Sequence, residues 1–136
     1  MSELAGKRVL VIGGETAAGR ALAVGLGEAG ADVAVVSLTK ARAAQFAINS
    51  ALNELWAMGR RGLALPIDAS DAAQVRDAVE RAERELGRLD GAAAVADEGT
   101  PVALEALRAA LPGREVIEVA ADASAAEAVE AMRKRV

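Results

Sequence analysis

A short glycine-bearing segment near the N-terminus has the residues and spacing needed to bind a phosphate group. Residues 9–12 are apolar, the segment from Gly13 to Gly19 predicts a turn, and a helical pattern begins at residue 17. The first N–H groups of a helix have no partner inside the helix, and with the helix dipole they attract an anion. We therefore expect the turn, including Thr16 and Ala18, to hold a phosphate.

Two residues of the turn oppose this expectation. Ala17 carries a Cβ at a position where the backbone has to approach the phosphate closely. Glu15 adds a negative charge near the anion, unless its side chain points to solvent. The alternative interpretation is that Gly13 and Gly19 only permit a tight turn and close packing. The sequence leaves both interpretations open.

Strand-like and helix-like patterns alternate along the chain and define the elements that would position this turn. Strands are predicted at residues 8–13, 32–38, 62–67, 90–96 and 114–120, and helices at 17–29, 41–58, 72–87, 101–111 and 124–134. Typical capping residues mark the helix ends: Gly30 and Gly59 follow helices, whereas Ser70 or Asp71, Thr100 with Pro101, and Ser124 with Glu127 begin them.

Strands that alternate with helices form a parallel sheet that is covered on both faces. We predict a single α/β domain over residues 1–136, a three-layer Rossmann-like fold with a five-stranded sheet. By analogy with dinucleotide-binding folds we choose the strand order 3-2-1-4-5, and 2-1-3-4-5 is the main alternative. Ligands of such sheets bind at the carboxyl ends of the strands.

The composition excludes several classes of function. The chain has 16 Lys and Arg against 20 Asp and Glu, which opposes nucleic-acid binding. No apolar run is long enough for a membrane span or a signal peptide, so we expect a cytoplasmic protein without a membrane partner. The chain has no His, Cys or Tyr, which argues against a zinc site and against the usual nucleophile–base pairs.

Carboxylates follow several of the predicted strands. Oxygen ligands of this kind bind Mg²⁺. Such residues more often cap the next helix or lead a loop into solvent, so we expect no metal. The residues concerned are Asp68, Asp97, Glu98 and Asp122.

The two aromatic residues, Phe46 and Trp56, are both on the predicted helix 41–58 and lie close to one face of it. The favoured interpretation is that both belong to the core. The alternative is an apolar strip for self-association, because Asn49 and Asn53 share that side. That alternative would make the protein a homo-oligomer.

Several segments in order resemble one family. They are Leu-Ala-Gly-Lys-Arg-Val-Leu-Val-Ile-Gly-Gly at 4–14, Arg-Ala-Leu-Ala at 20–23, Ile-Asp-Ala-Ser-Asp at 67–71 and Glu-Leu-Gly-Arg-Leu-Asp at 85–90. From about Leu4 to Ala96 the chain resembles the short-chain dehydrogenase/reductase family, whose Gly-x-x-x-Gly-x-Gly turn aligns with Gly13, Ala17 and Gly19. The resemblance implies a dinucleotide whose adenine contacts Asp68, and we include the neighbouring Ala69 in the site.

The end of the second predicted strand bears on which dinucleotide is bound. An NAD-specific protein usually has an acid there for the ribose hydroxyls. Ser37 and Thr39 occupy this region and Lys40 and Arg42 follow, so the missing acid and the nearby positive charges favour NADP. The alternative is that Lys40 and Arg42 merely begin a solvated helix.

The departures from the family pattern concern catalysis. Ala-Val-Ala-Asp at 94–97 replaces the family's Asn-Asn-Ala-Gly, Tyr is absent, and no Lys occurs between Lys40 and Lys134, so the Tyr-x-x-x-Lys motif cannot form. The pattern ends one helix after the fifth strand, and we expect the substrate-binding half to be missing.

We predict that the domain binds NADP or a related nucleotide without dehydrogenase activity of its own. The alternatives are an interaction module without cofactor, an oxidoreductase completed by a partner chain or second protomer, and a minimised or designed domain.

Overall fold

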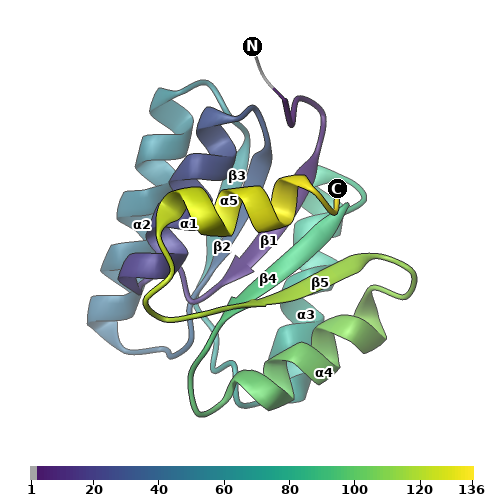
Figure 1. Ribbon diagram of the computed structural model, residues 1–136. Coiled ribbons are helices and arrows are strands. Elements are labelled where there is room, and N and C mark those ends of the chain that lie inside the picture. Colours follow the sequence, from purple (N-terminus) through teal and green to yellow (C-terminus); the bar gives the residue numbers. More distant parts are fainter. Residues whose placement is uncertain (1–2) are drawn as a thin grey trace.

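Ten elements alternate along the chain in the computed structural model, which describes residues 3–136 (Figure 1). The strands are β1 (Arg8–Ile12), β2 (Asp32–Val36), β3 (Gly62–Leu65), β4 (Gly91–Val95) and β5 (Glu115–Val119). The helices are α1 (Ala17–Glu28), α2 (Arg42–Ala57), α3 (Ala72–Leu86), α4 (Thr100–Ala110) and α5 (Ala125–Arg133). The predicted succession of strands and helices is confirmed, and the strands end slightly earlier than predicted.

The five strands form one sheet in the order β3-β2-β1-β4-β5, and every neighbouring pair is parallel. This confirms the order 3-2-1-4-5 and excludes 2-1-3-4-5. In register, Val9 of β1 is opposite Val33 of β2 on one side and Gly91 of β4 on the other. The turn after β1 therefore lies between the loops after β2 and β4, at the carboxyl edge of the sheet.

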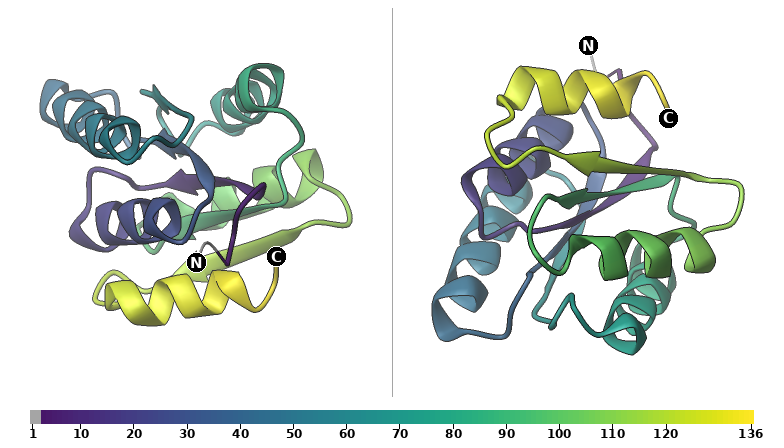
Figure 2. Two further views of the ribbon diagram at one scale, coloured as in Figure 1. Left: turned by 90° about the horizontal axis from the view of Figure 1, so that it is seen from above. Right: turned by 60° about the horizontal axis from the view of Figure 1, so that its bottom comes forward.

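Each face of the sheet has its own hydrophobic core, as expected for a three-layer fold. Leu10 and Ile12 of β1 pack with the apolar side chains of α3 and α4, which lie side by side (Figure 2). Val9 and Val11 pack on the other face with α1, α2 and α5. The residues of β4 are all buried although most of them are alanines, and their small side chains let the helices approach the sheet closely.

Helix α5 closes the face that α1 and α2 also cover. Its N-cap, Ser124, accepts a bond from the N–H of Glu127, and the Ser124 hydroxyl bonds the Glu127 carboxylate at 2.9 Å, a variant of the predicted capping box. Gly25 of α1 allows close contact, since a Cβ there would lie 2.5 Å from a methyl group of Val129.

The capping predictions for two other helices are resolved by the side-chain bonds. Asp71, not Ser70, is the N-cap of α3, and its side chain accepts a bond from the N–H of Ala73. The prediction that Thr100 caps α4 is wrong, because Gly99 occupies the N-cap. The Thr100 hydroxyl is buried and donates to the carbonyl of Val95 at 2.8 Å, so it bonds the end of β4 instead of the helix.

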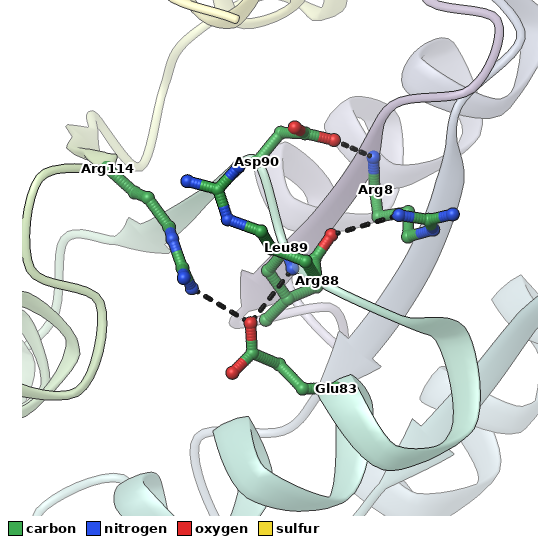
Figure 3. Close-up of polar contacts among 6 residues, drawn as sticks. All are labelled: Arg8, Glu83, Arg88, Leu89, Asp90 and Arg114. Carbon is green, nitrogen blue, oxygen red and sulfur yellow. Dashed lines mark hydrogen bonds and ion pairs between the residues drawn. The ribbon is translucent and has the colours of Figure 1, made fainter.

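A polar cluster ties the opposite, amino edge of the sheet together (Figure 3). The Asp90 carboxylate accepts a bond from the N–H of Arg8 at 2.9 Å. The Glu83 carboxylate accepts from the N–H of Leu89 at 3.0 Å and pairs with Arg114 at 2.9 Å. These contacts join α3 and the loop after it to β1 and β5, and they lie at the edge opposite to the glycine-bearing turn.

Among residues 3–136, none of the helices combines the length and the apolar character that crossing a membrane requires.

Candidate functional site

The turn between β1 and α1 is held by Thr16 and the two outer glycines. Gly13 has a φ of +100°, a conformation that favours glycine. The Thr16 hydroxyl donates to the carbonyl of Gly13 at 2.7 Å and accepts from the N–H of Gly19 at 2.9 Å. One threonine thus closes the turn and caps the helix.

Both outer glycines are required by packing. A Cβ at Gly19 would lie 1.9 Å from the carbonyl oxygen of Gly13, and a Cβ at Gly13 would lie 2.8 Å from the Cβ of Val95. Packing therefore requires glycine at both positions, whether or not the turn also holds a phosphate. The same packing brings the start of α1 to the carboxyl edge of the sheet, where a ligand would bind.

Two N–H groups at the start of α1 remain for an anion. Ala17 and Ala18 are the first two residues of the helix, and they precede its first internal hydrogen bond. The Thr16 hydroxyl satisfies the N–H of Gly19 but not these two. Ala17 is exposed and Ala18 is buried.

The Glu15 side chain bonds the backbone of a neighbouring loop. Its carboxylate accepts the N–H of Leu38 through both oxygens, at 2.8 and 3.0 Å, and the N–H of Thr39 at 3.3 Å. It therefore joins the turn after β1 to the loop after β2, instead of pointing into solvent. The Glu15 carboxylate therefore lies against the loop after β2, a segment that has no acidic residue of its own.

Ser37 belongs to the sheet and not to the exposed edge. The side chain is fully buried, its hydroxyl donates to the carbonyl of Ile67 at 3.2 Å, and it accepts the N–H of Ile67 at 2.9 Å. These bonds extend the pairing of β2 with β3 beyond the last ladder residues. Ser37, which the sequence places in the ribose region, therefore has no exposed hydroxyl, whereas Thr39 and Lys40 are exposed.

Asp68 lies in a hollow of about 210 Å³ at the carboxyl edge of the sheet. One oxygen of its carboxylate accepts the Ser70 hydroxyl at 2.5 Å and the Ser70 N–H at 3.0 Å. These two bonds hold the pKa of Asp68 below its usual value, and Lys40 contributes to the same effect. The hollow is lined by Leu38, Thr39, Asp68, Ala69, Ser70, Asp97, Glu98 and Gly99.

The hollow combines apolar and polar walls at the ends of β2, β3 and β4. A larger hollow of about 310 Å³ lies between α3 and α4, but it is lined mainly by alanines of those helices. The smaller one contains the predicted adenine residues, Asp68 and Ala69, beside Leu38. The sequence prediction missed Leu38, which acts through its backbone N–H and so leaves no signature in its residue type.

The acids near the strand ends do not form a metal centre in the described part of the chain. Asp68, Asp97 and Glu98 line the same hollow. Within residues 3–136, no group of three or more acidic, His or Cys side chains is placed to hold an ion.

The placement of Phe46 and Trp56 in the core is wrong. Their side chains are 68% and 56% exposed, because α2 buries the stripe that contains Ala44 and Ile48 instead. Phe46 is two residues beyond Ala44, about 200° around the helix, and therefore faces solvent.

A family model described as short chain dehydrogenase matches residues 7–101. Among curated proteins, the chain is 38% identical over 90 residues to L-rhamnose 1-dehydrogenase (NAD(P)(+)) of Sphingomonas sp. (strain SKA58), covering 66% of this chain and 34% of that protein. It is 33% identical over 123 residues to cyclohexanol dehydrogenase of Rhodococcus sp. (strain TK6), covering 85% of this chain and 45% of that protein.

Solved structures with the same fold include two that contain a cofactor. One is a blue fluorescent protein from a metagenomic library in complex with NADPH, at 29% identity and a TM-score of 0.71. The other is a short chain dehydrogenase from Burkholderia cenocepacia J2315 in complex with NADP, at 29% identity and a TM-score of 0.68. Each alignment covers 85% of this chain and 56% of the other. The chain thus spans less than half the length of these curated relatives and just over half of the solved structures.

Proposed function

The chain belongs to the short-chain dehydrogenase family, and on that premise we propose that it binds an NAD(P)-type dinucleotide at the carboxyl edge of its sheet. The observation that carries the proposal is the arrangement of two subsites. Ala17 and Ala18 begin α1 with N–H groups that no helical bond uses, and the hollow at Asp68 lies at the same edge of the sheet. In open α/β sheets the pyrophosphate of a dinucleotide lies at a helix N-terminus and the ligand binds along the carboxyl ends of the strands.

The family membership supports a nicotinamide cofactor over other nucleotides. Two structures 29% identical to this chain were solved with NADPH and with NADP, which supports NADP as a ligand that this chain accepts. The exposed side chain of Lys40 is in the loop after β2, where a 2′-phosphate would lie. The opposing charge is the carboxylate of Glu15 in the same region.

By itself the chain is not expected to catalyse hydride transfer. The sequence contains no Tyr, so the Tyr-x-x-x-Lys motif of the family has no counterpart in it. The domain would then act as a nucleotide-binding unit, in the cytoplasm. The alternative is an oxidoreductase that is completed by a partner chain or a second protomer.

Calorimetric titration of the purified chain with NADH, NADPH and ATP tests the proposal. The informative variant is Ala17→Asp, because a carboxylate in the first turn of α1 is favourable for the helix but repels a pyrophosphate. We expect the variant to fold as well as the wild type and to lose at least about tenfold in dinucleotide affinity, the effect of roughly 1.4 kcal/mol.

Ala125→Asp is the matched control. Ala125 is the first residue of α5 and is exposed, so the substitution adds the same charge at the same helix position away from the site. Dinucleotide affinity should be unchanged in this control. Absence of binding at millimolar concentrations of all three nucleotides would refute the proposal and favour an interaction module without cofactor.

The absence of turnover is tested separately. We expect no protein-dependent oxidation of NADPH or NADH, followed at 340 nm, with a broad panel of carbonyl substrates. Steady oxidation by highly purified protein would contradict this part of the proposal and leave nucleotide binding intact.

A further inference from the structure

The Glu15 carboxylate occupies the region between the ends of β1 and β2. It comes from the turn after β1, yet it binds backbone N–H groups 23 and 24 residues further along the chain. The bonds to Leu38, at 2.8 and 3.0 Å, involve both carboxylate oxygens. Since each bond is charge-assisted, the side chain is held in this position rather than sampling solvent.

This region is where the adenosine ribose lies in a dinucleotide bound to such a sheet. Ser37, Leu38 and Thr39 follow β2 and are all neutral, so no acid for the ribose comes from that segment. Glu15 supplies the missing carboxylate from a different loop. Glu15 is half-buried as a residue.

The chemistry of a carboxylate distinguishes a ribose hydroxyl from a phosphate. An ionised carboxylate only accepts hydrogen bonds and has about four lone-pair sites, so it can accept a hydroxyl proton in addition to the backbone bonds. A 2′-phosphate brings further acceptors and negative charge. The N–H groups of Leu38 and Thr39, which could otherwise bind the phosphate, already donate to Glu15. Charge repulsion and the loss of these two donors both weaken the binding of a 2′-phosphate relative to a 2′-hydroxyl.

The ion pairs of this region leave Glu15 out. Arg20 pairs with Glu54 of α2 at 3.0 Å and also donates to Ser50. Glu15 has no ion-pair partner among the described residues, so no cation neutralises its charge directly.

We propose that Glu15 is the residue that selects the cofactor, accepting the 2′-hydroxyl of the adenosine ribose and disfavouring a 2′-phosphate, so that the chain binds NAD(H) more tightly than NADP(H). The inference rests on the proposed dinucleotide binding. It opposes the NADP preference that the sequence predicts, because the segment after β2 has no acid but the turn after β1 supplies one.

The test compares Glu15→Gln with the wild type. Glutamine keeps the length of the side chain and one acceptor oxygen but removes the charge. Affinities are measured by calorimetry for NADH and NADPH, and for 5′-AMP and adenosine 2′,5′-bisphosphate, which isolate the adenosine end. In the wild type we expect NADH to bind on the order of tenfold more tightly than NADPH. In Glu15→Gln the ratio should fall to within about threefold.

Glu28→Gln is the control, because Glu28 is exposed at the far end of α1 and its replacement changes the net charge equally. The ratio of the two affinities is the decisive readout, since a purely structural role of Glu15 would weaken both nucleotides alike. Glu15→Ser provides a second variant if the glutamine protein is poorly folded, as judged by circular dichroism.

The outcomes separate the two proposals. If neither dinucleotide nor 5′-AMP binds at millimolar concentration, the proposed function fails and this inference falls with it. If dinucleotides bind but the wild type prefers NADPH, or if neither Glu15 variant changes the ratio, only the role of Glu15 is refuted.

Discussion

Replacing Gly19 with alanine is expected to destabilise the protein, although alanine is the better helix former. Gly19 is the third residue of α1, and its N–H donates to the Thr16 hydroxyl at 2.9 Å. An added Cβ would lie 1.9 Å from the Gly13 carbonyl oxygen and 2.5 Å from its carbon. Both atoms belong to the backbone of the turn, so the clash cannot be relieved by rotating a side chain.

In Gly19→Ala, the gain in helix propensity opposes the cost of the steric clash, and both affect the free energy of unfolding. Gly→Ala inside a helix gains up to about 1 kcal/mol. Overpacking of a tight contact costs about 1–3 kcal/mol, and disruption of the Thr16 cap adds about 1 kcal/mol. The free energy of unfolding should therefore fall by about 1–3 kcal/mol, which a domain of ordinary stability, roughly 5–15 kcal/mol, survives.

Urea denaturation followed by far-ultraviolet circular dichroism is the suitable assay. Fluorescence is less informative, because the single Trp, Trp56, is already 56% exposed in the folded protein. Ala43→Gly is the control: Ala43 is exposed near the start of α2, so its variant reports the value of a Cβ in a helix without any clash. We expect this control to lose about 0.5–1 kcal/mol.

A Gly19→Ala protein as stable as the wild type, or more stable, would refute the reasoning. It would mean that the turn relaxes at little cost and that the close approach of α1 to the Gly13 carbonyl is not required by the fold.

Three further predictions follow from contacts elsewhere. Phe46→Ser and Trp56→Ser should each change the free energy of unfolding by less than about 0.5 kcal/mol, because both side chains are largely exposed; a loss above 2 kcal/mol in urea titrations would contradict their exposure. Ser70→Ala should raise the pKa of Asp68 toward its usual value, measured from the carboxyl ¹³C shift. Since that pKa is depressed in the folded state, its stabilising effect is present above the unfolded pKa and is lost as the pH falls through the folded pKa; an unchanged pKa in Ser70→Ala would exclude the Ser70 bonds as the cause. Glu83→Ala should lower the free energy of unfolding by about 1–2 kcal/mol, because it removes the carboxylate that accepts from the Leu89 N–H and pairs with Arg114. A variant as stable as the wild type in urea titrations would show that water replaces the carboxylate as acceptor.

The sequence by itself determined the succession of elements, whereas the strand order 3-2-1-4-5 rests on analogy with dinucleotide-binding folds and is confirmed by the structure. Patterns of period two and period 3.6 are local properties, and each helix in this chain has recognisable ends, such as Gly30 and Gly59 with positive φ. The handedness rule for parallel connections then leaves few arrangements of five strands. Even β4, a run of alanines with little intrinsic strand preference, was placed by its spacing, and its pairing with β1 and β5 is what makes it a strand.

The exposure of Phe46 can be predicted from the sequence. The stripe of Ala44, Ile48, Leu52 and Leu55 on α2 predicts which face of the helix is buried, and Phe46 lies outside that stripe. The favoured placement in the core followed residue type instead of helical position, since large aromatic side chains are usually well buried.

Only the tertiary structure decided the roles of the polar residues at the edge of the sheet. Glu15 meets the N–H of Leu38 because β1 and β2 are neighbours in register, and no local pattern encodes a contact between a side chain and a distant backbone group. The burial of Ser37 has a similar cause, because its hydroxyl bonds Ile67 where the paired strands β2 and β3 end. Types and spacing of residues fix which groups can do chemistry, whereas the packing of strands and loops fixes which partner each group meets.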